Sequence, residues 1–207
     1  MKKLESSLKN MAIVLTGVTV IAGGILGYVN ELTKEPIREA NAKALSDAIQ
    51  LVVPGFTNDP SADPETVEVN GVSYKVYKAE KDGRFIGAAV EATENGFGGA
   101  LTILAGFDPE GKIIDYSVLS HSETPVLGSK SAEWFKKGAK GDITGMNPGE
   151  KELTVSKDGG QVDAITASTI TSRAFLKAVN AAYAAYSGQN KTDGNSGASQ
   201  QAKNVEQ

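Results

Sequence analysis

Hydroxyl side chains crowd one short stretch near the end of the chain, residues 163–172, which reads DAITASTITS. Five of its last seven residues carry a hydroxyl group, namely Thr166, Ser168, Thr169, Thr171 and Ser172. Apolar residues at helical spacing follow, so we expect a helix to begin at about Thr169. A hydroxyl at a helix start can cap a backbone N–H group, and the free N–H groups there also bind phosphate. The stretch therefore indicates either an over-supplied helix cap or a phosphate site in which one hydroxyl is esterified.

A glycine-rich loop is the second candidate for chemistry. Its residues are Asn95, Gly96, Phe97, Gly98 and Gly99. Glycine lets a backbone approach a flat ligand closely, and an aromatic ring such as Phe97 can stack on that ligand. The loop lacks the G-x-G-x-x-G spacing and opens no helix, so it is not a dinucleotide-binding fingerprint. A tight turn between two strands is the alternative interpretation.

A dense polar run over residues 120–128 is the third candidate. It begins with Ser120, His121, Ser122, Glu123 and Thr124. One interpretation is an anchored hydrolase that uses Ser120 or Ser122 with His121. Side chains so close along one strand end rarely converge in space, and the chain has no G-x-S-x-G elbow. We therefore favour a loop that hydrogen-bonds the rim of a heterocycle.

The composition narrows the possible functions. The chain has 207 residues, enough for one domain with a sizeable core. It has no cysteine and one histidine, which excludes disulfides, thiolate metal sites and multi-histidine metal or haem sites. A net charge of −4 without a basic cluster argues against nucleic acid as a partner. Any redox chemistry must therefore come from a bound cofactor that needs no cysteine ligand.

An apolar segment near the N-terminus predicts a single transmembrane helix over residues 10–30. The run Met11–Val29 would be roughly 30 Å long as a helix, about the thickness of one hydrocarbon core. Basic residues precede it, namely Lys2, Lys3 and Lys9. We therefore expect residues 1–9 on the cytoplasmic side and the rest of the chain on the outer, periplasmic side of the cell membrane. A cleaved signal peptide is the alternative, but its apolar core is usually shorter and ends at a small-residue cleavage site.

Small residues form a stripe inside this predicted span. Thr19, Gly23 and Gly27 lie four residues apart. Such a stripe lets another helix approach closely, which favours a subunit of a membrane complex. The alternative is that glycine and threonine are simply common in membrane helices.

The rest of the chain predicts an α+β fold, in which helices pack on an antiparallel sheet. A helix would begin at Pro36 and end before Pro54. Alternating apolar residues then predict a meander of strands over residues 67–69, 72–77, 85–92, 100–107 and 112–119. The dipeptides Asn70-Gly71 and Asp82-Gly83 are the turn signals between the first three strands.

Shorter elements are expected after the meander. They are a helix over residues 131–137, strands over residues 152–155 and 162–165, and a last helix from Thr169 to Tyr186 with Gly188 as its cap. The polar, low-complexity residues 187–207 predict a disordered tail. Residues 31–186 would then form one extracytoplasmic domain.

Three motifs, in this order, make the chain resemble the FMN-binding domain of the G subunit of Rnf-type ion-translocating ferredoxin:NAD oxidoreductases. The motifs are Gly96-Phe97-Gly98-Gly99-Ala100, Glu123-Thr124-Pro125-Val126-Leu127-Gly128 and Asp163-Ala164-Ile165-Thr166-Ala167-Ser168-Thr169. Val126 and Ala167 stand where glycine is commoner in the family, and Ser168 where alanine is commoner. The chain is similar, more distantly, to the C subunit of the sodium-translocating NADH:quinone oxidoreductase. The resemblance runs from the anchor to about Tyr186.

The resemblance implies an electron-transfer subunit that carries FMN. In that family the last threonine of the third motif holds FMN through a phosphoester bond, and this position is Thr169. The cofactor-binding residues it implies are Gly96, Phe97, Gly98, Gly99, Glu123, Thr124, Leu127, Gly128, Asp163, Thr166, Ala167, Ser168 and Thr169. It implies no metal ligand and no catalytic residue in this chain.

The resemblance also implies partners. They are the other subunits of a membrane redox complex, a flavin transferase that attaches FMN, and the lipid bilayer. Electron flow in that complex would be coupled to ion movement, yet the predicted span has no ionisable residue and so no ion path of its own. Two alternatives remain at this point: a C subunit of the NADH:quinone enzyme, or an anchored binding module without a redox role.

Overall fold

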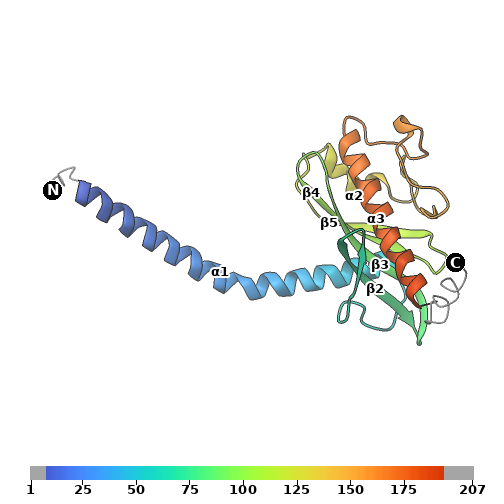
Figure 1. Ribbon diagram of the computed structural model, residues 1–207, viewed down its shortest axis with the longest axis horizontal. Helices are drawn as coiled ribbons and strands as arrows, with labels where there is room; N and C mark the ends of the chain where they lie inside the picture. Colours follow the sequence, from blue (N-terminus) through green and yellow to red (C-terminus); the bar gives the residue numbers. More distant parts are fainter. Residues whose placement is uncertain (1–7, 194–207) are drawn as a thin grey trace, which may run out of the picture. The chain divides into compact units, whose positions relative to one another are not determined.

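The computed structural model describes residues 8–193, and the chain divides into two compact units, residues 1–44 and 45–207 (Figure 1). Helix α1 (Leu8–Val52) begins in the first unit and ends in the second. It is a single helix that contains Pro36, so the prediction of a separate helix beginning at Pro36 is wrong. A proline removes one backbone hydrogen bond, and the good helix formers on both sides carry the helix past it.

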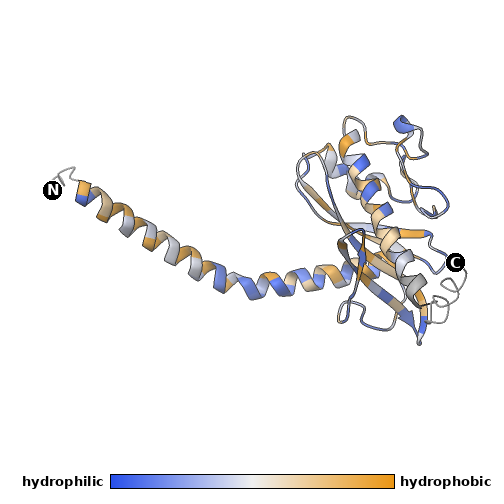
Figure 2. Ribbon diagram, in the orientation of Figure 1, coloured by the Kyte–Doolittle hydropathy of each residue, from blue (hydrophilic) through white to orange (hydrophobic). Residues whose placement is uncertain are grey.

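The N-terminal part of α1 is apolar on all sides (Figure 2). Its most hydrophobic window has a mean hydropathy of 2.1 and is entirely exposed in the structure. Leu15, Leu26 and Tyr28 each expose 70% or more of their surface. By length and composition this helix can cross a membrane. A hydrophilic stretch follows it before the sheet (Figure 2).

The predicted antiparallel meander is confirmed. Its strands are β1 (Glu65–Val69), β2 (Val72–Lys81), β3 (Arg84–Asn95), β4 (Ala100–Phe107) and β5 (Ile113–His121). They pair in chain order, β1-β2-β3-β4-β5, and every pair is antiparallel. Asn70 and Gly71, with φ of 54° and 78°, make the first turn, and Asp82 and Gly83, with φ of 51° and 75°, make the second. Both turns have the positive φ angles that a two-residue hairpin requires.

Apolar side chains cover both faces of this sheet. Val90, Ile103 and Phe107 belong to the core on one face, together with residues of helix α3 (Thr169–Asp193). Tyr77, Ala89 and Leu104 belong to the core on the other face, together with the end of α1. Neighbouring residues of a strand point to opposite faces, so β3 and β4 are apolar almost throughout because both of their faces are buried.

The end of α1 packs closely on the sheet. Ile49, Val52 and Val53 are all at most 1% exposed. Gly106 in β4 lies directly beneath them, and a Cβ at this position would come within 2.2 Å of the Val52 carbonyl oxygen. Only glycine therefore lets this turn of the helix reach the strand.

Aromatic rings fix α3 on the opposite face. Phe175 stacks on Phe135, with 4.3 Å between ring centroids, and meets Tyr116 edge to face at 4.7 Å. Burial raises the pKa of the Tyr116 phenol, so its hydroxyl stays protonated and donates to the Ser131 carbonyl at 2.7 Å. Phe107 stacks on Tyr186 farther along α3, at 5.2 Å. These contacts set the position of the first turn of α3, where the hydroxyl residues lie.

The segment between β5 and α3 differs from the predictions. It holds the short helices η1 (Gly128–Lys130), α2 (Ser131–Trp134) and η2 (Ser156–Asp158). The helix predicted over residues 131–137 thus ends at Trp134. The predicted strands over residues 152–155 and 162–165 are absent from the described chain, where Val155 and Val162 form only an isolated parallel bridge. Their apolar residues are buried in the core without any partner strand to extend a ladder.

The last helix begins at Thr169 as predicted, but it continues to Asp193. The prediction that it ends at Tyr186 with Gly188 as its cap, and that the tail begins at residue 187, is therefore wrong for residues 187–193. A glycine inside a helix costs only about 0.5–1 kcal/mol, and no proline follows to stop it. Residues 194–207 of the predicted tail lie outside the described residues.

Candidate functional site

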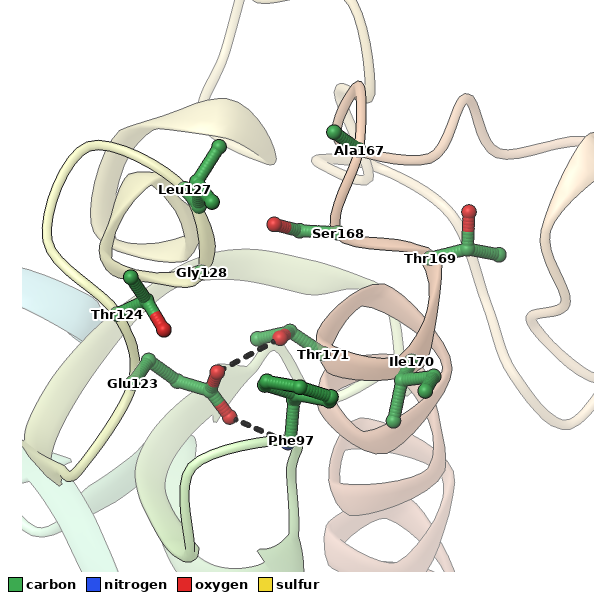
Figure 3. A pocket seen from close by; sticks show the side chains of 10 residues that line it. All are labelled: Phe97, Glu123, Thr124, Leu127, Gly128, Ala167, Ser168, Thr169, Ile170 and Thr171. Carbon is green, nitrogen blue, oxygen red and sulfur yellow. Dashed lines mark hydrogen bonds between the residues drawn. The ribbon is translucent and has the colours of Figure 1, made fainter.

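One pocket of about 410 Å³ lies where the three motifs meet (Figure 3). The loop between β3 and β4 contributes Phe97, and the first turn of α3 with the residues just before it contributes residues 167–171. The segment after β5 contributes Glu123, Thr124, Leu127 and Gly128. Stretches far apart in the sequence thus converge on one site, as the order of the motifs implied.

Glu123 holds these three parts together. Its side chain is almost completely buried, with 6% of the residue exposed. One carboxylate oxygen accepts hydrogen bonds from the backbone N–H groups of Phe97, at 2.8 Å, and Gly98, at 3.4 Å. The other accepts the Thr171 hydroxyl at 2.8 Å. A single carboxylate therefore ties the glycine loop to the start of α3 (Figure 3).

The glycines of the motifs make room for Glu123. A Cβ on Gly96 would lie 1.9 Å from one Glu123 carboxylate oxygen, and a Cβ on Gly128 would lie 2.4 Å from the other. A Cβ on Gly98 would lie 2.1 Å from the Ser122 carbonyl oxygen. Gly96, Gly98 and Gly99 do not line the pocket. In this structure the loop glycines serve the buried carboxylate, and Phe97 alone of this loop faces the pocket.

The hydroxyls at the start of α3 divide into two groups. Thr171 and Ser172 are buried, and both are hydrogen-bonded within the protein. Ser172 Oγ accepts the N–H of Ile165 at 2.9 Å and donates to the Ser168 carbonyl at 2.9 Å, so it fixes the turn that enters the helix. Ser168 and Thr169 line the pocket instead. Figure 3 shows the Ser168 hydroxyl pointing into the pocket and the Thr169 hydroxyl at its edge.

Backbone donors accompany these two hydroxyls. Within residues 8–193, the N–H groups of Thr169, Ile170 and Thr171 donate to no protein acceptor. The first N–H groups of a helix have no partner inside it and carry the positive end of the helix dipole. The Thr169 hydroxyl also accepts a hydrogen bond from Lys157 Nζ at 3.2 Å. This edge of the pocket is thus rich in donors and suited to an anion.

Two predicted site residues lie outside the pocket. The Asp163 carboxylate accepts the Ser156 hydroxyl at 3.1 Å, and its carbonyl accepts the Trp134 indole N–H at 2.8 Å. Asp163 therefore holds the segments around the site in place. Thr166 is exposed and does not line the pocket. Sequence reasoning named neither Ile170, an apolar wall of the pocket, nor Lys157, whose contact with Thr169 no spacing rule predicts.

The two departures from the family's glycines fall at special backbone positions. Val126 has a φ of 65° and Ala167 a φ of 62°. Both angles lie in the left-handed region, which glycine adopts without strain and which disfavours residues with a Cβ, branched ones most. The structure thus gives a physical reason why glycine is commoner at these positions in the family.

Replacing either residue with glycine is expected to stabilise the protein. For Ala167→Gly the relief of strain exceeds the entropy that glycine adds to the unfolded chain, and we expect a gain of about 1 kcal/mol. Val126→Gly should gain at least as much, because valine is branched and its side chain is 70% exposed. Urea unfolding measures both. Ala132→Gly, in the helix α2, is the matched control and should instead lose roughly 0.5–1 kcal/mol.

The arrangement around His121 does not resemble a hydrolase site. His121 Nδ1 accepts the backbone N–H of Glu123 at 3.3 Å. Within the described residues, neither Ser120 nor Ser122 exchanges a side-chain hydrogen bond with His121, and the Glu123 carboxylate is already engaged by Phe97 and Thr171. A nucleophile and its base must lie within hydrogen-bond reach of each other.

Comparisons with known proteins agree with this geometry. The FMN-binding domain family matches residues 96–184, which contain all three motifs. The chain is 31% identical to the G subunit of the ion-translocating oxidoreductase complex of Photorhabdus laumondii, over 84% of this chain and 87% of that protein. It is 32% identical to the G subunits of the same complex from Yersinia pestis, over 76% and 80%, and from Aliivibrio fischeri, over 86% and 89%.

These relatives bear the name of the Rnf-type G subunit and not that of the NADH:quinone oxidoreductase subunit. The shared length includes most of the chain, and the apolar part of α1 makes the protein membrane-anchored. The matched domain supplies the cofactor class, FMN. The chain belongs to the family of G subunits of ion-translocating oxidoreductase complexes.

Proposed function

We propose that this protein transfers electrons within a membrane-bound, ion-translocating oxidoreductase complex by means of FMN bound covalently to Thr169. The observation that carries the covalent assignment is the setting of the Thr169 hydroxyl. It lies at the edge of the pocket, beside unpartnered helix N–H groups and within 3.2 Å of Lys157 Nζ. The matched domain and the relatives support the cofactor and the complex.

The residues of the pocket fit FMN. A volume of about 410 Å³ lies in the range of small-molecule sites. Phe97, Leu127 and Ile170 are 67%, 41% and 52% exposed, so they offer apolar surface to a flat ring. The donors at the start of α3 offer the complementary surface for a phosphate. An apolar wall and an anion-binding edge thus stand side by side, as a flavin mononucleotide requires.

When bound, FMN supplies one-electron and two-electron redox chemistry. The residues of this chain provide its setting. Phe97, Leu127 and Ile170 would shield the ring from water, and Thr124 would offer a hydroxyl at its rim. Glu123 holds the glycine loop and the helix start at a fixed separation through its hydrogen bonds. Attachment through the phosphate leaves the ring unmodified, so only these contacts tune it.

The esterified oxygen is Thr169 Oγ1 in this proposal. Ser168 is the competing hydroxyl, since it points into the pocket (Figure 3). Thr169 is favoured because its hydroxyl contacts a cation, which would stay in place to pair with the ester's negative charge. An ester here would form by loss of the hydroxyl proton and of the leaving group on the flavin phosphate, with a separate flavin transferase as catalyst.

We propose a topology to match. Residues 1–9 lie in the cytoplasm, residues 10–30 span the membrane, and the FMN domain lies on the outer face. The lysines before the span and the exposed apolar surface of α1 support this orientation. The stripe of Thr19, Gly23 and Gly27 would contact another subunit. Thr19 already donates its hydroxyl to the Leu15 carbonyl at 2.8 Å, so it enters the bilayer without an unpaired donor.

The test is an intact mass and a peptide map of the protein purified from membranes of its native host. We expect a mass gain equal to FMN minus water. Trypsin cleavage after Lys157 and Arg173 isolates residues 158–173, and fragmentation of that peptide should place the gain on Thr169. A gain on Ser168 would overturn the residue assignment. An unmodified peptide from a host with an active flavin transferase would overturn covalent attachment altogether.

A further inference from the structure

Lys157 reaches Thr169 from a separate segment of the chain. Its Nζ lies 3.2 Å from the Thr169 hydroxyl oxygen. Lys157 is the central residue of η2, which precedes α3 by several residues. A lysine ammonium has three donors, and in the described residues this is the one hydrogen bond that its side chain makes. The ammonium therefore keeps donors for a further acceptor at this edge of the pocket.

Its two neighbours are tied down on either side. Arg173 in α3 donates from Nε and Nη2 to the two carboxylate oxygens of Asp158, both at 2.7 Å. The Ser156 hydroxyl donates to Asp163 at 3.1 Å, and the Ser156 N–H donates to the Val162 carbonyl at 2.7 Å. The short helix η2 is thus clamped to the start of α3, and its central lysine faces the first residue of that helix.

The charges of this region leave Lys157 available. Arg173 and Asp158 satisfy each other, and the hydrogen bond from Arg173 holds the pKa of Asp158 below its usual range. That pair stays ionised at neutral and mildly acidic pH. Asp163 is engaged by Ser156, and the carboxylate of Glu123 is buried and turned to Phe97 and Thr171. Lys157 is the cation that contacts the candidate ester oxygen.

We propose that Lys157 is the cationic partner of the phosphodiester formed at Thr169, and that the η2 clamp of Asp158 with Arg173 and Ser156 with Asp163 positions it. This inference rests on the proposed function, since it requires a phosphate at Thr169. A phosphodiester carries one negative charge, and a charge-assisted hydrogen bond from an ammonium is among the stronger contacts it can make. The inference also gives the first residue of the third motif a role, because Asp163 acts through Ser156.

The test compares Lys157→Gln and Lys157→Arg with the wild-type full-length chain. Each is co-expressed with the host's flavin transferase, and the fraction of chains carrying flavin is followed over time by intact mass. We expect attachment to Lys157→Gln to slow by about tenfold, the effect of one charge-assisted hydrogen bond, and Lys157→Arg to restore most of it. Lys151→Gln removes the same charge from an exposed site in the preceding loop and should behave as wild type.

A second measurement reads the phosphate directly. The phosphorus-31 chemical shift of the attached ester should move in Lys157→Gln and return toward the wild-type value in Lys157→Arg. Attachment at the wild-type rate together with an unchanged shift in Lys157→Gln would overturn the inference while leaving the proposed function intact. Absence of any ester in the wild-type chain would overturn both.

The clamp is tested by a double-mutant cycle. Arg173→Gln should slow attachment, because it frees η2, but Lys157→Gln combined with Arg173→Gln should be no slower than Lys157→Gln alone. Residues that act through one another show such non-additivity. Additive effects would overturn the positioning role of Arg173.

Discussion

Replacing Thr169 with alanine is expected to remove covalent flavin completely while the domain stays folded. The substitution deletes the one oxygen that the proposal esterifies, so no slower route to the same adduct remains. The first turn of α3 keeps its own supports, because Ser172 bonds Ser168 and Ile165 and Thr171 bonds Glu123. Loss of a helix-start hydroxyl costs about 1 kcal/mol at most. Intact mass and in-gel flavin fluorescence measure the adduct, and urea unfolding measures the fold.

Two neighbouring hydroxyls provide matched controls. Thr166→Ala changes an exposed residue outside the pocket and should keep full flavin. Ser168→Ala removes the hydroxyl that points into the pocket and should keep the covalent bond, because alanine is commoner there in the family. Flavin on Thr169→Ala, or its loss from Ser168→Ala alone, would contradict the assignment.

Replacing Glu123 with alanine is expected to destabilise the domain by about 3 kcal/mol, the cost of leaving several buried donors without a charged acceptor. The Phe97 and Gly98 N–H groups and the Thr171 hydroxyl would all lose their partner. The glycine loop and the helix start would then separate, so we also expect covalent flavin to fall sharply. Urea unfolding of the flavin-free chain isolates the effect on stability.

The milder variant Glu123→Gln separates shape from charge. It keeps the size of the side chain and one acceptor oxygen, so it should lose roughly 1–2 kcal/mol and retain part of its flavin. A Glu123→Ala protein as stable as wild type would show that the buried carboxylate is not what joins the two segments.

The sheet could be predicted from the sequence because its rules are local. Alternation of apolar residues and the dipeptides Asn70-Gly71 and Asp82-Gly83 determine strands and turns within a few residues of one another. The elements that were predicted wrongly depend on distant partners. Val155 and Val162 look like strand residues, but they are buried by the core and have no strand beside them.

The site was predictable to the extent that motifs carry it. Phe97, Leu127 and the residues around Thr169 were named from sequence, and they line one pocket. The role of the glycines was not predictable, because it depends on where the Glu123 carboxylate lies in space. Lys157 was missed because its contact with Thr169 arises from the clamp on η2, which no spacing in the sequence reveals.

The strand order of the sheet bears on when the cofactor can be attached. Each strand pairs with its neighbour in the chain, so the hairpins can form early and close to the ribosome's order of synthesis. The helix α3 comes last and contacts β1, β3 and β4 across the finished sheet. The pocket edge around Thr169 therefore exists only after this final docking. A transferase that recognises the folded pocket would pass over incomplete chains, and the bound flavin would mark each molecule whose maturation is finished.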